Sequence, residues 1–288
     1  MKDQSKSVKQ HNFQVPQQVI GKAKFLQFFS KSLTSNFLTK LFITPFKYKT
    51  PEREEMMRES AKKELVLIPA LGYEVMVYTY GYSKTKILLA HAWSGRGTQM
   101  YAIADLLLEN GMMVLSFDAP AHGLSKGKTI TPIEYVKTIE FLSEKYGPFD
   151  AAVGHSYGAI SLLKCVSNGL KIDKLVTIGT TATITNVIVD FIEKFQLKPT
   201  MVASFKKKLN SKFKQDIDAF SPVESAKNIE IPTLVIHDTK DTDVDVSSAF
   251  KLRQNLKQGT LLITNGLGHR SVVRDATVLH KICAFIKG

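Results

Sequence analysis

The chain has 288 residues, of which 44% are hydrophobic and 23% charged, and its formal net charge is +13. This composition is typical of one large globular domain or two small ones, and no stretch approaches the roughly 18 consecutive apolar residues of a membrane-spanning helix. The polar start lacks the apolar core of a secretory signal, and Cys165 and Cys283 lie in apolar helical patterns that indicate a reducing compartment, so we expect a cytoplasmic protein.

Residues 1–63 predict a basic helical arm without strands. Residues 1–50 contain nine lysines and one acid, Asp3, and apolar residues between Ile20 and Phe42 recur near helical spacing. Such a helix can pack its apolar face against the body of the protein. It can also lie on an anionic membrane surface. We favour packing and keep weak membrane contact as the alternative. No nucleic-acid motif accompanies the lysines, so we expect no nucleic-acid partner.

From residue 64 onward, apolar strand patterns alternate with amphipathic helical patterns. This order predicts an α/β domain with a mostly parallel eight-stranded sheet covered on both faces. The first two strands are separated only by a tight turn, which predicts an antiparallel hairpin. The expected strands are Leu65–Pro69, Glu74–Tyr80, Lys86–Ala92, Met113–Asp118, Ala151–His155, Lys174–Gly179, Thr233–His237 and Thr260–Thr264. The expected helices are Thr98–Asn110, Pro132–Tyr146, Tyr157–Gly169, Val246–Lys257 and Arg270–Lys287.

One long segment interrupts this alternation. Residues 181–222 are helical in pattern, and an insertion of this length in a compact domain is typical of a cap. We therefore expect a core made of residues 64–180 and 223–288, with residues 181–222 as an inserted helical cap. Six apolar cap residues either line an acyl pocket or hold the cap to the body: Phe191, Ile192, Phe195, Leu197, Met201 and Phe205.

The strongest chemical signal is the pentapeptide Gly154-His155-Ser156-Tyr157-Gly158, placed between a predicted strand and a predicted helix. This is the G-x-S-x-G pattern in which a strained turn exposes a nucleophilic serine. The two glycines allow the neighbouring backbones to approach closely. We therefore predict Ser156 as a nucleophile.

A nucleophilic serine needs a base, and the base needs an orienting acid. His269 lies in a glycine-rich loop after the last strand, where it can reach Ser156, and we predict it as the base. The loop after the preceding strand offers Asp238, Asp241 and Asp243 as acids. The residues alone do not decide which of the three is the acid. An aspartate that does not pair with the base can instead cap the helix that follows.

Together these motifs resemble those of the α/β-hydrolase superfamily, in its serine esterase-like branch with a helical cap. Four stretches match in the family's order: the serine turn, 237–244 against H-G-x-x-D-x-x-V, 91–95 against the H-G-W turn, and 118–125 against D-x-P-G-H-G-x-S. The resemblance implies that Asp241 is the acid and that the backbone N–H groups of Trp93 and Tyr157 form an oxyanion hole. This sequence departs from the family where Ala92, Ala121 and Asp238 replace glycines.

The resemblance implies a serine hydrolase that cleaves carboxylic esters or thioesters through an acyl-enzyme. The alternative is a non-catalytic protein that keeps the fold and binds a ligand or partner, for which the three replaced glycines are the best support. The sequence has no spaced His/Cys cluster and no phosphate-binding loop, so we expect neither a metal nor a cofactor.

Overall fold

The structure, a computed structural model, describes residues 15–288. Four charged residues of the predicted arm, Lys2, Asp3, Lys6 and Lys9, lie outside the described residues. In the described part of the chain, no helix has both the length and the apolar character needed to cross a membrane.

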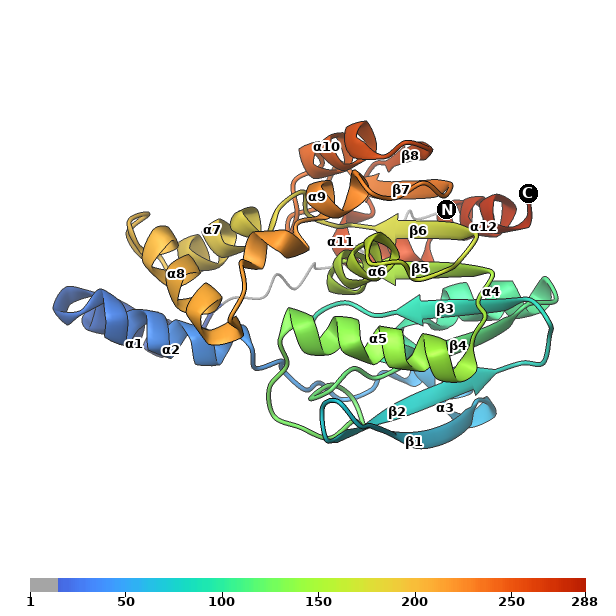
Figure 1. Cartoon of the computed structure of the whole chain (residues 1–288), viewed down its shortest axis with the longest axis horizontal. Helices are drawn as coiled ribbons and strands as arrows, with labels where there is room; N and C mark the ends of the chain where they lie inside the picture. Colours follow the sequence, from blue (N-terminus) through green and yellow to red (C-terminus); the bar gives the residue numbers. More distant parts are fainter. Residues whose placement is uncertain (1–14) are drawn as a thin grey trace, which may run out of the picture.

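The described chain forms one eight-stranded sheet with helices on both faces (Figure 1). The strands are β1 (Lys62–Ile68), β2 (Tyr73–Tyr80), β3 (Lys86–Ala90), β4 (Met113–Phe117), β5 (Ala151–His155), β6 (Lys174–Ile178), β7 (Thr233–Asp238) and β8 (Gly259–Thr264). Their order in the sheet is β1-β2-β4-β3-β5-β6-β7-β8. β2 pairs antiparallel with both β1 and β4, and all other pairs are parallel. The predicted hairpin and the mostly parallel sheet are therefore confirmed.

Helices and short 3-10 turns connect the strands. The helices are α1 (Gln17–Phe29), α2 (Lys31–Phe42), α3 (Glu55–Ser60), α4 (Tyr101–Glu109), α5 (Pro132–Tyr146), α6 (Tyr157–Ser167), α7 (Ile184–Lys194), α8 (Met201–Phe213), α9 (Pro222–Ala226), α10 (Ser247–Asn255), α11 (Gly268–Ser271) and α12 (Ala276–Lys287). The 3-10 turns are η1 (Glu52–Glu54), η2 (Gly97–Met100), η3 (Ile217–Phe220) and η4 (Val272–Arg274).

The sheet separates two apolar cores because successive strand residues point to opposite faces. In β3, Leu88 packs with residues of α5 and α6, whereas Ile87 and Leu89 pack with residues of α4 and α12. All three side chains are fully buried. A strand covered on both faces is apolar throughout, which explains the uninterrupted hydrophobic runs in the sequence.

The helix predicted over Arg270–Lys287 is not continuous. It divides into α11, η4 and α12, and Asp275 separates the last two. Asp275 has an extended backbone (φ −72°, ψ 129°), and its side chain accepts a hydrogen bond from the backbone N–H of Val278. This N-cap starts a new helix, which is why a single helix was the wrong prediction.

The arm and the cap pack against each other. Helix α2 packs on α8, and Figure 1 shows α1 and α2 side by side next to the cap helices, away from the sheet. The ring of Phe42 lies 5.1 Å from that of Phe191 and 5.5 Å from that of Phe205. Of the six apolar cap residues, all but Phe191 are buried. The contacts of Phe191 and Phe205 with Phe42 join the cap to the arm, whereas the two expected roles were lining an acyl pocket and holding the cap to the body.

Candidate active site

Ser156 occupies a strained turn between β5 and α6. Its φ is +52° and its ψ is −111°, a backbone conformation that is costly for a residue with a side chain. Both flanking positions require glycine, because a side chain there would clash with neighbouring backbone atoms. A Cβ on Gly154 would lie 2.6 Å from the Cα of Ala159, and a Cβ on Gly158 would overlap the carbonyl oxygen of Ala90 at the end of β3. The turn therefore has the backbone geometry of a nucleophile elbow.

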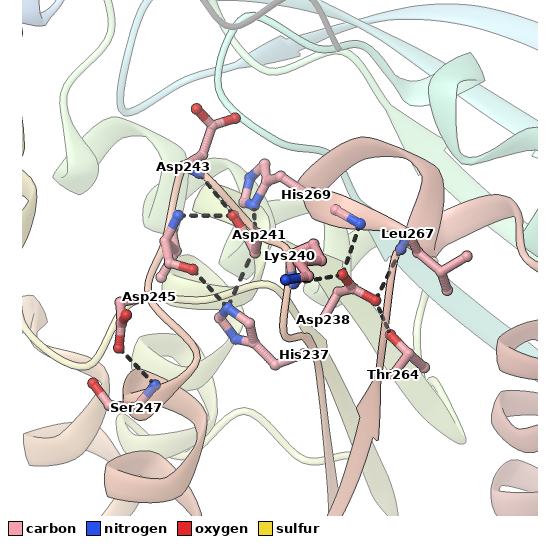
Figure 2. Close-up of polar contacts among 12 residues, drawn as sticks. His237, Asp238, Lys240, Asp241, Asp243, Asp245, Ser247, Thr264, Leu267 and His269 are labelled. Atoms are coloured by element: carbon pink, nitrogen blue, oxygen red, sulfur yellow. Dashed lines mark hydrogen bonds and ion pairs between the residues drawn. The ribbon is translucent and has the colours of Figure 1, made fainter. Parts of the chain in front are cut away.

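His269 and Asp241 meet at the carboxyl ends of the strands. Nδ1 of His269 lies 2.7 Å from Oδ2 of Asp241, whose side chain is only 1% exposed (Figure 2). Oδ1 of Asp241 accepts backbone N–H bonds from Asp243 at 2.9 Å and Val244 at 2.8 Å. Burial by itself would raise the pKa of Asp241, but hydrogen bonds from His237 and His269 outweigh it and hold this pKa well below its usual value. Asp241 is therefore an anion that orients the His269 ring.

The His269 loop lies directly beside the serine turn. Nε2 of His155, the residue before Ser156, donates a hydrogen bond to the carbonyl oxygen of His269 at 2.8 Å, and the two rings are 4.9 Å apart. The backbone N–H of Ser156 donates a hydrogen bond to the carbonyl oxygen of Ile178. Gly179, which follows Ile178, faces the His269 ring, and a Cβ on Gly179 would lie 3.2 Å from Cε1 of His269. The structure thus brings His269 and Ser156 to the same end of the sheet.

The contact of His155 is not predictable from the motif, in which this position is variable. The side chain is buried, and burial together with the neighbouring His269 lowers the pKa of His155 to about 3. A neutral imidazole has one N–H. The bond to the His269 carbonyl places that hydrogen on Nε2, so His155 holds the loop by a neutral hydrogen bond.

Asp238 has a role different from that of an acid paired with the base. Its carboxylate accepts the backbone N–H groups of Leu267 at 3.0 Å and Gly268 at 2.9 Å and the hydroxyl of Thr264 at 2.7 Å (Figure 2). The partners include the two residues immediately before His269. These hydrogen bonds outweigh the effect of burial and lower the pKa of Asp238. Asp238 therefore fastens the loop that carries His269.

The third candidate acid, Asp243, turns its carboxylate away from His269 (Figure 2). It lies 3.8 Å from Nζ of Lys194 on the cap helix α7. The alternative interpretation, in which Asp238 or Asp243 caps α10, is wrong. The acceptor there is Asp245, whose Oδ1 receives the backbone N–H of Ser247 at 2.9 Å. Of the three carboxylates, the structure brings Asp241 to His269.

Trp93 and Tyr157 lie in contact at the two turns that the resemblance assigns to an oxyanion hole. Their rings are 5.2 Å apart, and the Trp93 ring is 5.4 Å from that of His122. In this turn the positive φ falls on Ser94, at +56°, and not on Ala92, so alanine replaces glycine there without strain. The Ser94 backbone N–H donates to Nε2 of His122 at 3.0 Å.

Asp118 holds the loop after β4 in place. Its carboxylate accepts the backbone N–H of Gly97 at 2.7 Å and of Leu124 at 2.8 Å, and the hydroxyl of Tyr78 at 3.0 Å. Ala121 in the same loop has a φ of +67°, where the family has glycine. An L-residue in this region costs about 1 kcal/mol. The surrounding hydrogen bonds hold the backbone in this form despite that cost.

A buried ion pair between the arm and the turn after Trp93 was not predicted. The Glu54 side chain is 1% exposed. Its carboxylate accepts hydrogen bonds from Nε of Arg96 at 2.6 Å, from Nη2 of Arg96 at 3.0 Å and from the hydroxyl of Thr98 at 2.9 Å. The two charged residues are 42 positions apart. Glu54 lies among other acidic and basic residues in the sequence, and nothing local marks it as buried.

Two of the molecule's cavities lie near the ends of the parallel strands. One of about 540 Å³ lies between α7 and the loop after β7, and its lining includes Asp190, Glu193, Asp241 and Asp245. A larger one of about 720 Å³ lies at the amino ends of the parallel strands, at the opposite edge of the sheet from Ser156. The smaller cavity is the one that adjoins the proposed acid.

No family model matches the sequence, and no match was found among curated proteins. Solved structures do match. The Pyrococcus furiosus esterase Pf2001 superposes with a TM-score of 0.67 at 18% identity, covering 85% of this chain and 98% of that one. The thioesterase domain from the curacin biosynthetic pathway gives 0.59 at 15%, covering 80% and 100%. A bromoperoxidase from Bacillus anthracis gives 0.62 at 15%, covering 79% and 100%. These likenesses, together with the sheet order and the serine turn, show that the chain has the α/β-hydrolase fold.

Proposed function

We propose that this protein is a serine hydrolase that cleaves carboxylic esters or thioesters, with Ser156 as nucleophile, His269 as base and Asp241 as acid. One observation carries the proposal: a histidine hydrogen-bonded to a buried carboxylate at 2.7 Å lies on a loop that contacts the residue before a serine held at φ +52° between a strand and a helix. A nucleophile, a base and an orienting acid are the parts that acyl transfer requires. The esterases and the thioesterase among the structural neighbours agree with this reaction class.

The proposed mechanism follows from the proton positions. Because Asp241 is ionised, Nδ1 of His269 carries the hydrogen of their bond, which leaves Nε2 free to accept the Ser156 proton. The Ser156 oxygen attacks the acyl carbon, and the backbone N–H groups of Trp93 and Tyr157 hold the resulting oxyanion. His269 then protonates the leaving alkoxide or thiolate, and water attacks the acyl-enzyme with His269 again as base. The bond between the acyl carbon and the Ser156 oxygen breaks, the carboxylic acid leaves, and His269 returns its proton to Ser156.

The two oxyanion donors belong to turns that close packing brings together. Gly158 permits the start of α6 to approach the carbonyl of Ala90 at the end of β3, and the Trp93 and Tyr157 rings contact each other on this junction. Removing one oxyanion donor typically costs about 100- to 1,000-fold in turnover. The close packing at this junction therefore sets the positions of the two proposed oxyanion donors, on which the rate of the proposed reaction depends.

The non-catalytic alternative loses part of its support. Its basis was the loss of three family glycines, but Ala92 needs no positive φ, and Asp238 uses its carboxylate to hold the His269 loop. Only Ala121 takes up a conformation that glycine would adopt more easily, and it lies in a bracing loop.

We retain a cytoplasmic location as part of the proposal, since both cysteines are free and buried.

The direct test is labelling by a fluorophosphonate probe, which reacts with activated serines. We expect the wild type to be labelled and Ser156→Ala and His269→Ala to lose labelling. Ser167→Ala, at the end of α6, and His280→Ala, exposed on α12, are matched controls that should label normally. Asp241→Asn should lower turnover of a p-nitrophenyl ester by about 10,000-fold, because it favours the wrong tautomer of the base. A folded wild type without labelling would refute the proposal.

A further inference from the structure

The turn between α1 and α2 exposes a group of large apolar side chains. Phe25 is 64% exposed, Phe28 84%, Phe29 64% and Leu33 54%. We refer to these four residues as the aromatic tip. Phe29 contacts both other rings, at 4.9 Å from Phe25 and 5.2 Å from Phe28, so the three rings form one continuous patch.

The aromatic tip is not needed to hold the arm in place. The opposite face of the two helices carries Ile20, Ala23 and Leu38, which are buried. The hydroxyl of Ser30 caps α2 at the turn by accepting the Leu33 backbone N–H at 3.3 Å. The arm is thus folded and anchored while the tip faces water. A continuous exposed apolar patch of this kind marks a surface that binds something.

The charge around the tip indicates which surface it binds. Residues 15–50 contain six lysines and no acid. Lys22, Lys24 and Lys31 are exposed on the same two helices. Exposed aromatic side chains that share two helices with exposed lysines match the interface of an anionic bilayer, where the rings enter the boundary between headgroups and acyl chains and the lysines meet the negative surface.

We propose that the aromatic tip docks this protein on anionic lipid membranes. Docking would also orient the rest of the molecule. The arm is fixed to the cap through the Phe42 contacts and by a 2.7 Å hydrogen bond from Nζ of Lys24 to the side chain of Gln196. The cap helix α7 in turn lines the 540 Å³ cavity that includes Asp241. The protein would therefore bind with its cap side toward the lipid.

Flotation of the full chain with vesicles tests this inference without relying on catalysis. The probes are phosphatidylcholine vesicles with and without phosphatidylserine, which supplies the negative surface. The test variant is Phe28→Ser combined with Phe29→Ser, two exposed positions whose substitution leaves the buried face intact. The control is Tyr82→Ser, which removes an aromatic ring that is 98% exposed in the β2–β3 connection, away from the arm.

We expect the wild type and Tyr82→Ser to float with the anionic vesicles and much less with phosphatidylcholine alone. Loss of two rings should weaken binding by about tenfold or more. Lys22→Glu with Lys31→Glu should also weaken it, and added salt should reduce binding of the wild type. Absence of wild-type binding, or equal binding by the Phe28/Phe29 variant, would overturn the inference. So would a dimer in solution that depends on the tip while vesicles are not bound.

Discussion

Asp238 provides a sharp test of how the His269 loop is held. The change is Asp238→Ala, which removes the carboxylate that accepts the Leu267 and Gly268 backbone N–H groups and the Thr264 hydroxyl. Asp238 is 1% exposed and the Gly268 contact is buried, so water cannot readily replace the lost acceptor.

The size of the effect follows from these contacts. A hydrogen bond to a charged group contributes about 1.5–3 kcal/mol, and a buried N–H left without a partner costs about 1–3 kcal/mol. The more exposed partners recover part of this through water, so we expect the free energy of unfolding to fall by roughly 2–4 kcal/mol. The Asp238 pKa is lowered in the folded state, so this stabilisation is present above the pKa of an unfolded aspartate, about 3.9, and is lost as the pH falls through the folded value.

Urea unfolding at pH 7 measures this difference, with Asp243→Ala as the matched control. Asp243 is in the same loop, but its carboxylate makes a half-exposed ion pair with Lys194 at 3.8 Å, which should contribute less than about 1 kcal/mol. Fluorophosphonate labelling should also slow in Asp238→Ala, because the loop that carries His269, the proposed base, is no longer held in place. If the two variants unfold at the same urea concentration, Asp238 does not hold the loop as we infer.

Three further predictions concern residues around the site. Arg96→Met should lower the free energy of unfolding by about 3–5 kcal/mol in urea titrations, because Glu54 stays buried without its partner; a loss below about 1 kcal/mol would contradict this. Burial lowers the pKa of His122 to about 4, so between about pH 6.5 and 4 the unfolded chain binds the proton and the native chain does not. The contribution of His122 to stability should fall by about 3 kcal/mol as the pH decreases across this range, and urea titrations of His122→Gln should show a shallower dependence of stability on pH. Gly158→Ala should lower the free energy of unfolding by about 3 kcal/mol or abolish soluble expression, because the new Cβ would overlap backbone. Gly21 is a helical site with open space, so Gly21→Ala should show equal or higher stability in thermal melting.

The sequence by itself determined much of the fold, because the relevant signals are local. The bounds of β5 and α5 were predicted to the residue, and the other strands agree within three residues, since strand and helix periodicity is visible in short windows. The serine turn between β5 and α6 was recognisable from five residues, because the close approaches at Gly154 and Gly158 leave room for no side chain.

Other features were decided only by the tertiary structure. The separate roles of Asp238 and Asp241 depend on where the β8–α11 loop lies, and the two aspartates are only three positions apart in one acidic loop. Glu54 pairs with Arg96 across 42 residues, and helix α2 of the arm packs on the cap. Hydrogen bonds and packing between distant segments leave no periodic trace in the chain, so these partners become visible only when the fold brings them together.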